Sequence, residues 1–439
     1  MSLYSELFYS QEVNEMFSDR NTIVAMLNVE VALAESQATH GIFEVGFAKI
    51  IAGCCTPENI DISKLKKEIK LGGNAAIPLV KQLTKAVKNR DFEASKFVHL
   101  GATSQDIVDT ATVLKIGQFV IWLDENLLKL KNELANLTER HKKTVMVGRT
   151  LLQQARPITF GLKTSAWLEG ICRSIERLNE MKSRLLVIQL SGAVGSQNSN
   201  LSLEVTQTFA EILKLNHAYS WQSQRDNLNE LASNLGILSG SLGKIAKDIS
   251  LLMQTEVGEV FEGAAEGKGG SSTMPHKRNP VTCAAILANA TRVPHLVGSM
   301  LSSMIQEHER SAGNWHAEWE VLTEIMLLTA GSLEKTVELI EGLEVDEKRM
   351  LANIEITQGL IFAENVSLAL ASKIGKIQSH ELVEKACKTA ISNKKHLKEI
   401  LIENQTEIEN LDELFNPENS IGNSIEIVDT ILNKYKGEL

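Results

Sequence analysis

The sequence predicts an all-α protein built around a bundle of long helices, and three observations support this fold class. Only seven prolines occur in 439 residues, and none lies between Pro157 and Pro275. So long a stretch without a helix breaker favours long helices. Two runs of apolar residues follow a helical period, whereas no comparable run alternates apolar and polar residues with period two. An extensive β-sheet is therefore not expected.

The two helical runs lie in the middle of the chain and share alternating spacings of three and four residues. The first contains Val113, Ile116, Val120, Leu123, Leu127, Leu130, Leu134 and Leu137, and the second contains Leu231, Leu235, Leu238, Leu242, Ile245, Ile249 and Leu252. Repeats of this kind predict helices that pack side by side. Gly236, Gly240 and Gly243 interrupt the second run. We interpret them as points of close helix–helix contact rather than as a hinge.

Shorter helices are expected on either side of the bundle. Gly72-Gly73 and Gly101 divide the N-terminal region, and beyond residue 350 the apolar pattern shortens until it reaches a loop at 416–419. We therefore predict an N-terminal helical domain at residues 1–102, a central bundle at 103–349 and a C-terminal helical domain at 350–439.

Composition excludes several classes of function. A formal net charge of −10 argues against a nucleic-acid partner, which would require a basic face. Five cysteines without metal-ligand spacing are typical of reduced thiols in the cytoplasm rather than of a disulfide framework. The N-terminus lacks the pattern of a signal peptide, and no run of 18 apolar residues predicts a membrane span.

Residues 269–280 carry the most informative motif, Gly-Gly-Ser-Ser-Thr-Met-Pro-His-Lys-Arg-Asn-Pro. Its glycines give the loop freedom, it offers two serine hydroxyls, and Lys277 and Asn279 are separated by one residue. Such a loop can fold over an anionic substrate and bring a hydroxyl to a carbon atom. An ordinary Gly/Ser linker has no need of so many specific residues at fixed positions.

Two further segments have candidate binding groups. In 98–106, Thr103 and Ser104 precede the first long helix, where their hydroxyls either cap the helix or hold a substrate carboxylate beside its positive end. The segment 148–153 reads Gly-Arg-Thr-Leu-Leu-Gln. The nearby His141 lies in a charged run that we expect to be solvated, so it is not a candidate.

The pattern Gly-Ser-Ser-x-Met-Pro-x-Lys-x-Asn-Pro resembles the signature loop of the fumarase/aspartase superfamily, and the other two segments resemble its first and second substrate-binding regions. The resemblance implies an all-α, three-domain subunit whose central helices form a homotetrameric bundle. Active sites would then lie where the three segments from different subunits meet. It also favours substrate binding over capping for Thr103 and Ser104.

Two families of this superfamily resemble the chain most. Adenylosuccinate lyases share His-x-Gly-x-Thr-Ser and Met-Pro-His-Lys-Arg-Asn-Pro, but they rely on a histidine and a glutamate where this chain has Leu151 and Ala284. A further histidine of theirs falls near Gly72-Gly73-Asn74, where none is present. Bacterial 3-carboxy-cis,cis-muconate cycloisomerases are similar over nearly the whole length, including 72–74, 224–226, 267–270, 306–310 and the run Trp-His-Ala-Glu-Trp-Glu at 315–320.

The absence of the histidine and the glutamate on which the lyases rely has a chemical explanation. Lyases expel an amine or a hydroxyl, which are poor leaving groups that need a general acid. In a cycloisomerase the group that adds to carbon is a carboxylate, whose pKa near about 4 leaves it ionised and nucleophilic. The resemblance therefore implies that a carboxylate of 3-carboxy-cis,cis-muconate adds across a double bond to give 4-carboxymuconolactone. This reaction belongs to the protocatechuate branch of aromatic catabolism and implies no metal and no organic cofactor.

The resemblance also assigns roles to residues. Ser271 is expected to carry the proton, with Ser272 as the other candidate, while Lys277 and Asn279 stabilise an enediolate-like intermediate. The residues expected to contact the small tricarboxylate substrate are His99, Thr103, Ser104, Arg149, Thr150, Gln153, Ser272, Met274, Arg310 and His316. For Arg149, Arg310, His99 and His316 the alternative is an ordinary surface ion pair.

Two alternative functions remain open at this point. One is an adenylosuccinate lyase-like cleavage of a C–N bond, against which the missing histidines and Ala284 count. The other is a catalytically silent structural homologue, for which a degraded signature loop would be expected, although the loop is intact here.

Overall fold

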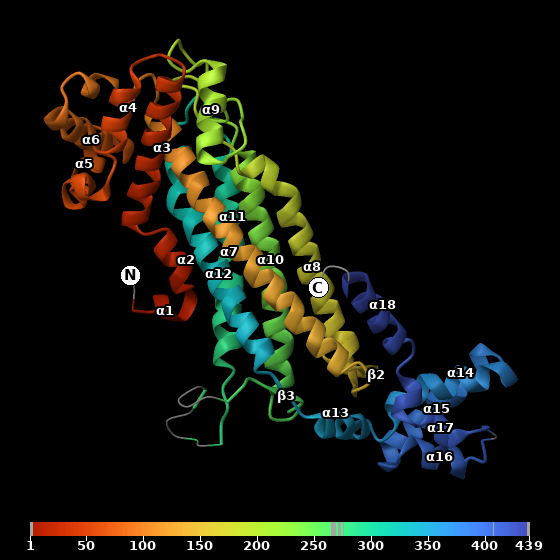
Figure 1. The fold of residues 1–439 in the computed structure, drawn as a ribbon. Coiled ribbons are helices and arrows are strands. Elements are labelled where there is room, and N and C mark those ends of the chain that lie inside the picture. The colour runs from red at the N-terminus through yellow and green to blue at the C-terminus, as the bar shows by residue number, and fades with distance from the viewer. Residues whose placement is uncertain (1–2, 265–268, 271–273, 275, 407, 437–439) are drawn as a thin grey trace. The chain divides into compact units, whose positions relative to one another are not determined.

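The structure is a computed structural model that describes residues 3–264, 269–270, 274, 276–406 and 408–436. The chain divides into two compact units. Unit 1 comprises the residues up to Leu127 together with Ser174–Leu242 and Ala288–Glu334, and unit 2 comprises Leu128–Arg173, Gly243–Leu287 and the residues from Lys335 onward. Both units are predominantly helical (Figure 1).

The helices and strands follow one another in a simple order. The long helices are α7 (Ser104–Arg140), α8 (Phe160–Leu185), α10 (Asp226–Leu252), α11 (Val281–Ser303) and α12 (Asn314–Glu341). The shorter elements of unit 1 are α1 (Ser5–Phe8), α2 (Gln11–Met16), α3 (Asp19–Thr39), α4 (Val45–Ala52), η1 (Pro57–Asn59), α5 (Ile62–Gly72), α6 (Ala76–Arg90), η2 (Ala94–Phe97) and α9 (Leu203–Leu213). Those of unit 2 are β1 (Val145–Thr150), β2 (Gln153–Thr159), β3 (Val260–Phe261), β4 (Glu344–Val345), α13 (Glu347–Ile354), η3 (Glu355–Thr357), η4 (Leu360–Phe362), α14 (Ala363–Ile374), α15 (Lys376–Asn393), α16 (Leu397–Glu403), α17 (Leu411–Leu414), η5 (Pro417–Ser420) and α18 (Ser424–Lys436).

The two apolar runs form α7 and α10, and the side chains of both runs are buried, which confirms the prediction of long packed helices. In unit 1, segments of the long helices lie side by side (Figure 1). A Cβ atom on Gly236 would come within 3.1 Å of Val297, so α10 and α11 touch at this glycine, as interpreted. A Cβ atom on Gly240, by contrast, would meet nothing within 4 Å, so this glycine makes no close helix contact with the part of the chain that the structure describes.

The shorter helices of unit 1 share one apolar core. α3 packs against α4 and α9, and buried side chains from α3, α6, α9 and the first turns of α7 meet there, among them Leu33, Leu83, Ile107 and Phe209. This core holds the N-terminal end of α7, which carries the first candidate segment.

Unit 2 contains a β-hairpin that the sequence did not predict. Strands β1 and β2 pair antiparallel, with an irregularity between Val147 and Arg149. Val145 and Val147 of β1 pack into the core formed with α14–α16. β3 and β4 form a second short antiparallel pair. Both sheets have two strands, so the expectation that no extensive sheet exists holds for the described residues.

His141 is the residue whose environment was predicted wrongly. Its side chain is 7% exposed rather than solvated, and its Nδ1 atom lies 3.1 Å from the Thr144 hydroxyl. Burial lowers the pKa of this histidine against the opposing effect of Glu347. The charged neighbours in the sequence therefore lie on the outside of the helix end while the imidazole turns inward.

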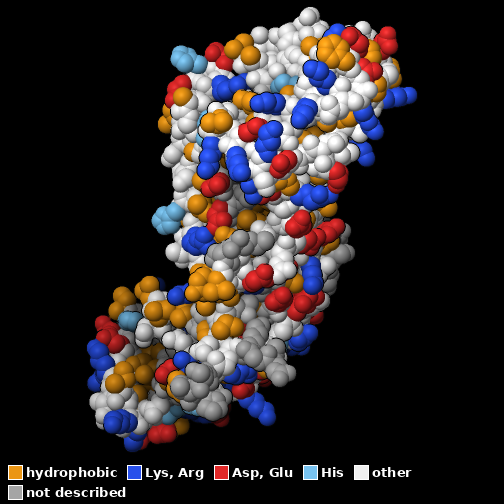
Figure 2. All heavy atoms as spheres, turned by 90° about the vertical axis from the view of Figure 1, so that its left-hand side faces the viewer, with side chains coloured by type: hydrophobic (Ala, Val, Ile, Leu, Met, Phe, Trp, Pro, Cys, Tyr) orange, Lys and Arg blue, Asp and Glu red, His pale blue; other side chains and the backbone are white. Residues whose placement is uncertain are grey.

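Side chains of both charges lie on the visible surface (Figure 2). On the face that Figure 2 shows, Lys and Arg side chains are interspersed with Asp and Glu side chains. Among the described residues, no helix combines the length and the apolar character that a membrane span requires.

Candidate active site

The first candidate segment is a tightly bound loop between η2 and α7 in unit 1. His99 and Gly101 have left-handed backbone conformations, with φ of 59° and 77°. The Gln37 side chain of α3 donates a hydrogen bond to the Leu100 carbonyl at 2.8 Å, and the Asn198 amide donates to the Gly101 carbonyl at 2.9 Å. The loop is thus anchored from two sides before the chain enters α7.

Asp106 caps the start of α7. Its carboxylate accepts a hydrogen bond from the Thr103 backbone N–H at 2.9 Å, and it also accepts from the backbone N–H groups of Ser191 and Gly192, both at 3.0 Å. The Thr103 hydroxyl has another role, because it accepts from Arg310 Nη2 at 2.8 Å. The Thr103 hydroxyl thus faces Arg310, and Asp106 binds the Thr103 backbone N–H in the manner of a capping box.

Arg310 and His316 lie in unit 1 together with Thr103. Besides Thr103, Arg310 Nη2 contacts the Ala193 carbonyl at 3.4 Å, so these contacts of Arg310 are to neutral oxygens rather than to the carboxylate of a surface ion pair. Its Nε is buried and has no hydrogen-bond partner among the described residues. His316 is exposed, lies 4.6 Å from the Trp319 ring between centroids, and contacts the Gly73 carbonyl through Nε2 at 3.1 Å.

A buried ionic cluster supports this part of unit 1. Arg225, the residue directly before α10, has a side chain that is 1% exposed and pairs with Asp109 of α7 at 2.7 Å and with Glu318 of α12 at 2.6 Å. The Trp315 indole also donates to Asp109 at 3.0 Å. The cluster joins three helices and fixes the first turn of α12, from which His316 extends. The sequence motifs at 224–226 and 315–320 contained Arg225, Trp315 and Glu318 but gave no sign that these residues would meet at Asp109.

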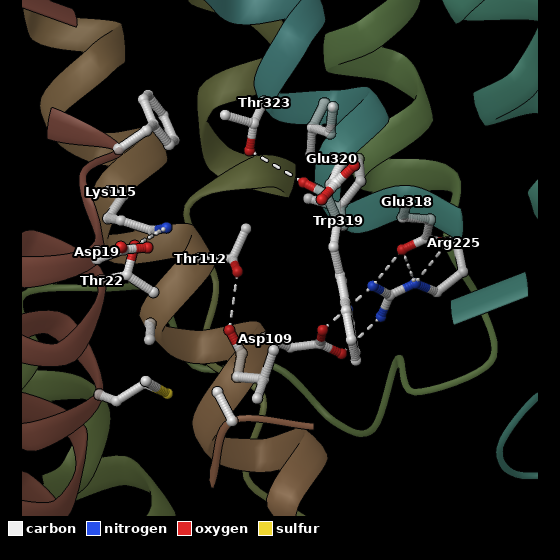
Figure 3. A pocket seen from close by; sticks show the side chains of 17 residues that line it. Asp19, Thr22, Asp109, Thr112, Lys115, Arg225, Glu318, Trp319, Glu320 and Thr323 are labelled. Atoms are coloured by element: carbon white, nitrogen blue, oxygen red, sulfur yellow. Dashed lines mark hydrogen bonds and ion pairs between the residues drawn. The ribbon is translucent and has the colours of Figure 1, made fainter. Parts of the chain in front are cut away.

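A cavity of about 330 Å³ adjoins the cluster. Figure 3 shows Arg225 between Asp109 and Glu318 on one side and Lys115 beside Thr22 on the other. Lys115 Nζ donates to the Thr22 hydroxyl at 3.0 Å and lies 5.1 Å from the centroid of the Phe17 ring. Burial lowers the pKa of Lys115 to about 8.

The second candidate segment is the β1–β2 hairpin of unit 2. Thr150 and Gln153 pair across a two-residue turn made of Leu151 and Leu152, whose φ angles are 48° and 66°. Leu151 is 96% exposed. Hairpin turns with two positive φ angles normally contain Asn or Gly. The Leu-Leu turn explains why the sequence did not reveal the hairpin.

Arg149 is held by a buried carboxylate. Its guanidinium donates to both carboxylate oxygens of Glu259, at 2.9 and 2.7 Å, and Glu259 is fully buried. The Asn353 amide donates to the same carboxylate at 2.7 Å. The alternative of an ordinary surface ion pair is therefore wrong for Arg149, and its charge is already balanced within unit 2.

The third candidate segment is the signature loop, of which Ser271 and Ser272 lie outside the described residues. The two ends of the loop are joined because the Asn279 backbone N–H donates to the Gly269 carbonyl at 2.9 Å. Gly269 has a φ of 69°, and a Cβ atom there would lie 2.8 Å from the Asn279 carbonyl oxygen. Only glycine fits this position. The described Met274 and Lys277 are exposed.

Arg278 anchors the loop to the β3–β4 pair. Its guanidinium donates to both carboxylate oxygens of Glu344 at 2.9 Å and to the Glu262 carbonyl at 2.6 Å, and it lies 4.9 Å from the centroid of the Phe261 ring. The residue between Lys277 and Asn279 is thus held at four points, which restricts the directions that its two neighbours can take.

Long helices, a capped loop before the first of them, and an anchored Lys-x-Asn loop together define the class of protein. The chain belongs to the lyase family, whose model, described as "Lyase", matches residues 9–295. A second model, described as "Adenylosuccinate lyase C-terminus", matches residues 359–431.

Named relatives narrow the class. The 3-carboxy-cis,cis-muconate cycloisomerase of Acinetobacter baylyi is 46% identical over 99% of both chains. That of Pseudomonas aeruginosa is 44% identical over 96% of this chain and 93% of its own. The crystal structure of the 3-carboxy-cis,cis-muconate lactonizing enzyme from Pseudomonas putida superposes with a TM-score of 0.95 at 42% identity, covering 99% of each chain. The predicted superfamily and fold class are confirmed, while the roles of individual residues remain predictions.

Proposed function

We propose that this chain is a cycloisomerase that converts 3-carboxy-cis,cis-muconate to 4-carboxymuconolactone. The observation that carries the proposal is the identity of 44–46% over nearly the full length to enzymes named for this reaction. A local feature agrees with it. The two positions at which lyases hold an acid–base pair carry Leu151 and Ala284, and both side chains are exposed and apolar.

The reaction needs one bond to oxygen and one proton on carbon. A carboxylate oxygen of the substrate attacks one end of a C=C bond, and the π electrons move toward the carbon next to another carboxyl group. The resulting enediolate is then protonated on carbon, which restores that carboxylate. Lys277 and Asn279 stabilise the enediolate through charge and a neutral donor, and Ser271 delivers the proton.

The substrate carries three negative charges, so the site must supply positive ones. Lys277 is exposed and available for this role, and Arg310 contacts only neutral oxygens in its hydrogen bonds within the described residues. Arg149, by contrast, is balanced by Glu259, so its contribution is to shape the hairpin that carries Thr150 and Gln153. His99, Ser104, Ser272, Met274 and His316 remain as predicted contacts.

The proposed assembly is a homotetramer with active sites shared between subunits, each subunit having the three domains predicted above. The long helices carry exposed apolar side chains that such a bundle would cover, among them Ile121 of α7, Ile237 of α10 and Leu301 of α11. Gly240 and Gly298 lie in open space, which leaves room for the close approach of another helix. None of the five cysteines, all of them described, forms a disulfide bond, which supports the cytoplasm as the compartment.

The test is a comparison of two substrates. Purified protein is incubated separately with 3-carboxy-cis,cis-muconate and with adenylosuccinate while ultraviolet absorbance is followed, and the products are identified by NMR. Loss of the conjugated diene with formation of the lactone is expected, together with no release of fumarate. Fumarate release at a comparable rate would establish the C–N lyase alternative, and inactivity toward both would favour a structural protein.

A further inference from the structure

Glu30 and His99 form a buried pair in unit 1, where the middle of α3 meets the loop before α7. The Glu30 side chain is 1% exposed, and its Oε1 lies 2.7 Å from Nδ1 of His99. A carboxylate at this depth is costly unless it is paired and hydrogen-bonded. In sequence, Glu30 interrupts an otherwise largely apolar stretch of α3, which is the one local sign of a special role.

The loop holds the His99 ring in a defined orientation. Its left-handed backbone, with φ of 59°, is more accessible to histidine than to most residues but still unfavourable. The hydrogen bonds that fix the Leu100 and Gly101 carbonyls maintain it. Backbone strain of this kind persists where the surroundings over-determine the conformation, and it is concentrated at functional sites.

The surroundings of His99 favour its charged form. Burial lowers the pKa of His99, but the charge and hydrogen bond of Glu30 and the charge of Asp106 outweigh burial, so the pKa is raised. At an ordinary pKa of 6.5, about a quarter of the molecules would be protonated at pH 7. Cys55 is another titratable neighbour of Glu30, and burial together with the charge of Glu30 raises the pKa of this thiol, so it stays neutral.

We propose that the Glu30–His99 pair is a fixed cation site for the substrate, in which Glu30 holds the imidazolium through Nδ1 and the Nε2–H of His99 donates to one substrate carboxylate. The His99 side chain is 20% exposed, and within the described residues its Nε2 has no hydrogen-bond partner. Arg310, bound to Thr103 in the same loop, adds a second positive charge. Glu30 is a positioning residue, because it acts through His99. The inference rests on the proposed function.

The first experiment measures the charge of His99 directly. Protein labelled with ¹⁵N-histidine is titrated by NMR, and the His99 signal is assigned by its loss in His99→Asn, a residue that also tolerates positive φ. The native His99 is expected to titrate above pH 6.5, and Glu30→Gln is expected to lower that pKa. Titration of native His99 below 6.5, or the same pKa in both proteins, would overturn the proposal. The native titration decides the point even if Glu30→Gln does not fold.

The second experiment measures binding without turnover, using propane-1,2,3-tricarboxylate as the probe. At pH 7.5 we expect Glu30→Gln to raise the Kd by about tenfold to a hundredfold, with the difference from the native protein narrowing at pH 6 as His99 becomes protonated. His99→Asn should weaken binding at both pH values. Glu35→Gln, an exposed glutamate on the same helix, is the control and should bind like the native protein. If Glu30→Gln weakened binding of the probe by the same factor at both pH values, the Glu30–His99 pair would be merely structural.

The two hypotheses fail separately. Native protein that turns over 3-carboxy-cis,cis-muconate while His99 titrates below 6.5 retains the proposed function and loses the cation site. Native protein that binds the probe through a protonated His99 but leaves 3-carboxy-cis,cis-muconate unchanged keeps the cation site and loses the proposed reaction.

Discussion

The chemistry proposed for this chain depends on single positively charged side chains. These side chains differ in how far neighbouring carboxylates balance their charge. Arg225 is balanced by two buried carboxylates, and Arg149 by one. His99 is paired with the single carboxylate of Glu30. Lys277 is exposed on the signature loop. The least compensated cation is the one best placed to respond to negative charge that develops on a bound substrate.

Lys277→Ala should therefore reduce kcat far more than it reduces stability. Loss of one electrostatic donor to an enediolate is expected to cost about 10²–10³ in rate, while the exposed position leaves packing unchanged. Steady-state kinetics and thermal melts of Lys277→Ala measure the two effects, and Lys385→Ala, an exposed lysine of α15, is the control. A parallel fall in stability, with normal activity in the folded fraction, would show that Lys277 is structural.

Lys115 gives a stability prediction with a defined dependence on pH. Because its folded pKa is about 8 and its unfolded pKa is about 10.4, the native state loses stability as pH falls from about 10 to about 8, and the loss is complete below that range. Lys115→Met should remove this penalty and stabilise the protein at pH 7 by on the order of 1–3 kcal/mol.

Urea unfolding of native protein and Lys115→Met at pH 7 and pH 10 tests this prediction, with Lys385→Met as the control. The stabilisation should shrink at the higher pH. Destabilisation at pH 7 would mean that the contacts with Thr22 and Phe17 outweigh the cost of burying the ammonium.

At the scale of elements, the long helices could be predicted and the hairpin could not. α7 and α10 carry apolar residues at helical spacing without proline, so their local preference and their packing agree. The β1–β2 hairpin depends on a Leu-Leu turn with positive φ, a conformation that leucine does not favour locally. Its strands are stabilised by packing against α13–α16, far along the chain.

In the candidate site too, the sequence predicted residues of the signature loop but not the partners that hold them. Its motif predicted Lys277 and Asn279 from residue types at fixed spacing. The partner that anchors the loop is Glu344, 66 positions from Arg278, and Glu30 is 69 positions from His99. Such pairs depend on how elements meet in space. The apolar stretch around Glu30 marks that residue as unusual, but no local pattern in the sequence indicates which residue is the partner.

Arg278 and Glu344 should act as a unit in positioning the loop. Arg278→Gln and Glu344→Gln are each expected to lower kcat by about tenfold, since misplacement of Lys277 and Asn279 by a fraction of an ångström affects the transition state. Stability should change by less than about 1 kcal/mol because the ion pair is half-exposed.

The charge-swapped double variant Arg278→Glu with Glu344→Arg should recover part of the lost rate. The exposed pair Arg184–Glu230 is the control, because replacing these two residues in the same way should leave kcat unchanged. Unaltered kcat in Arg278→Gln would contradict a positioning role.

At the scale of the whole molecule, the chain has a lyase fold without the acid–base pair of lyases. Its relatives at 44–46% identity are named cycloisomerases, and the positions of the absent pair are Leu151 and Ala284. The central claim is that the ionised carboxylate of the substrate makes such a pair unnecessary, because it is already a nucleophile.

The most direct test restores the pair. We would measure kcat/KM for 3-carboxy-cis,cis-muconate in native protein and in the double variant Leu151→His with Ala284→Glu, with intact assembly checked by size exclusion. Native protein should form the lactone, and the double variant should be no faster and is expected to be slower, since it places a new negative charge before a trianion. A clear rise in lactonisation by the double variant would contradict the claim that no acid–base pair is needed.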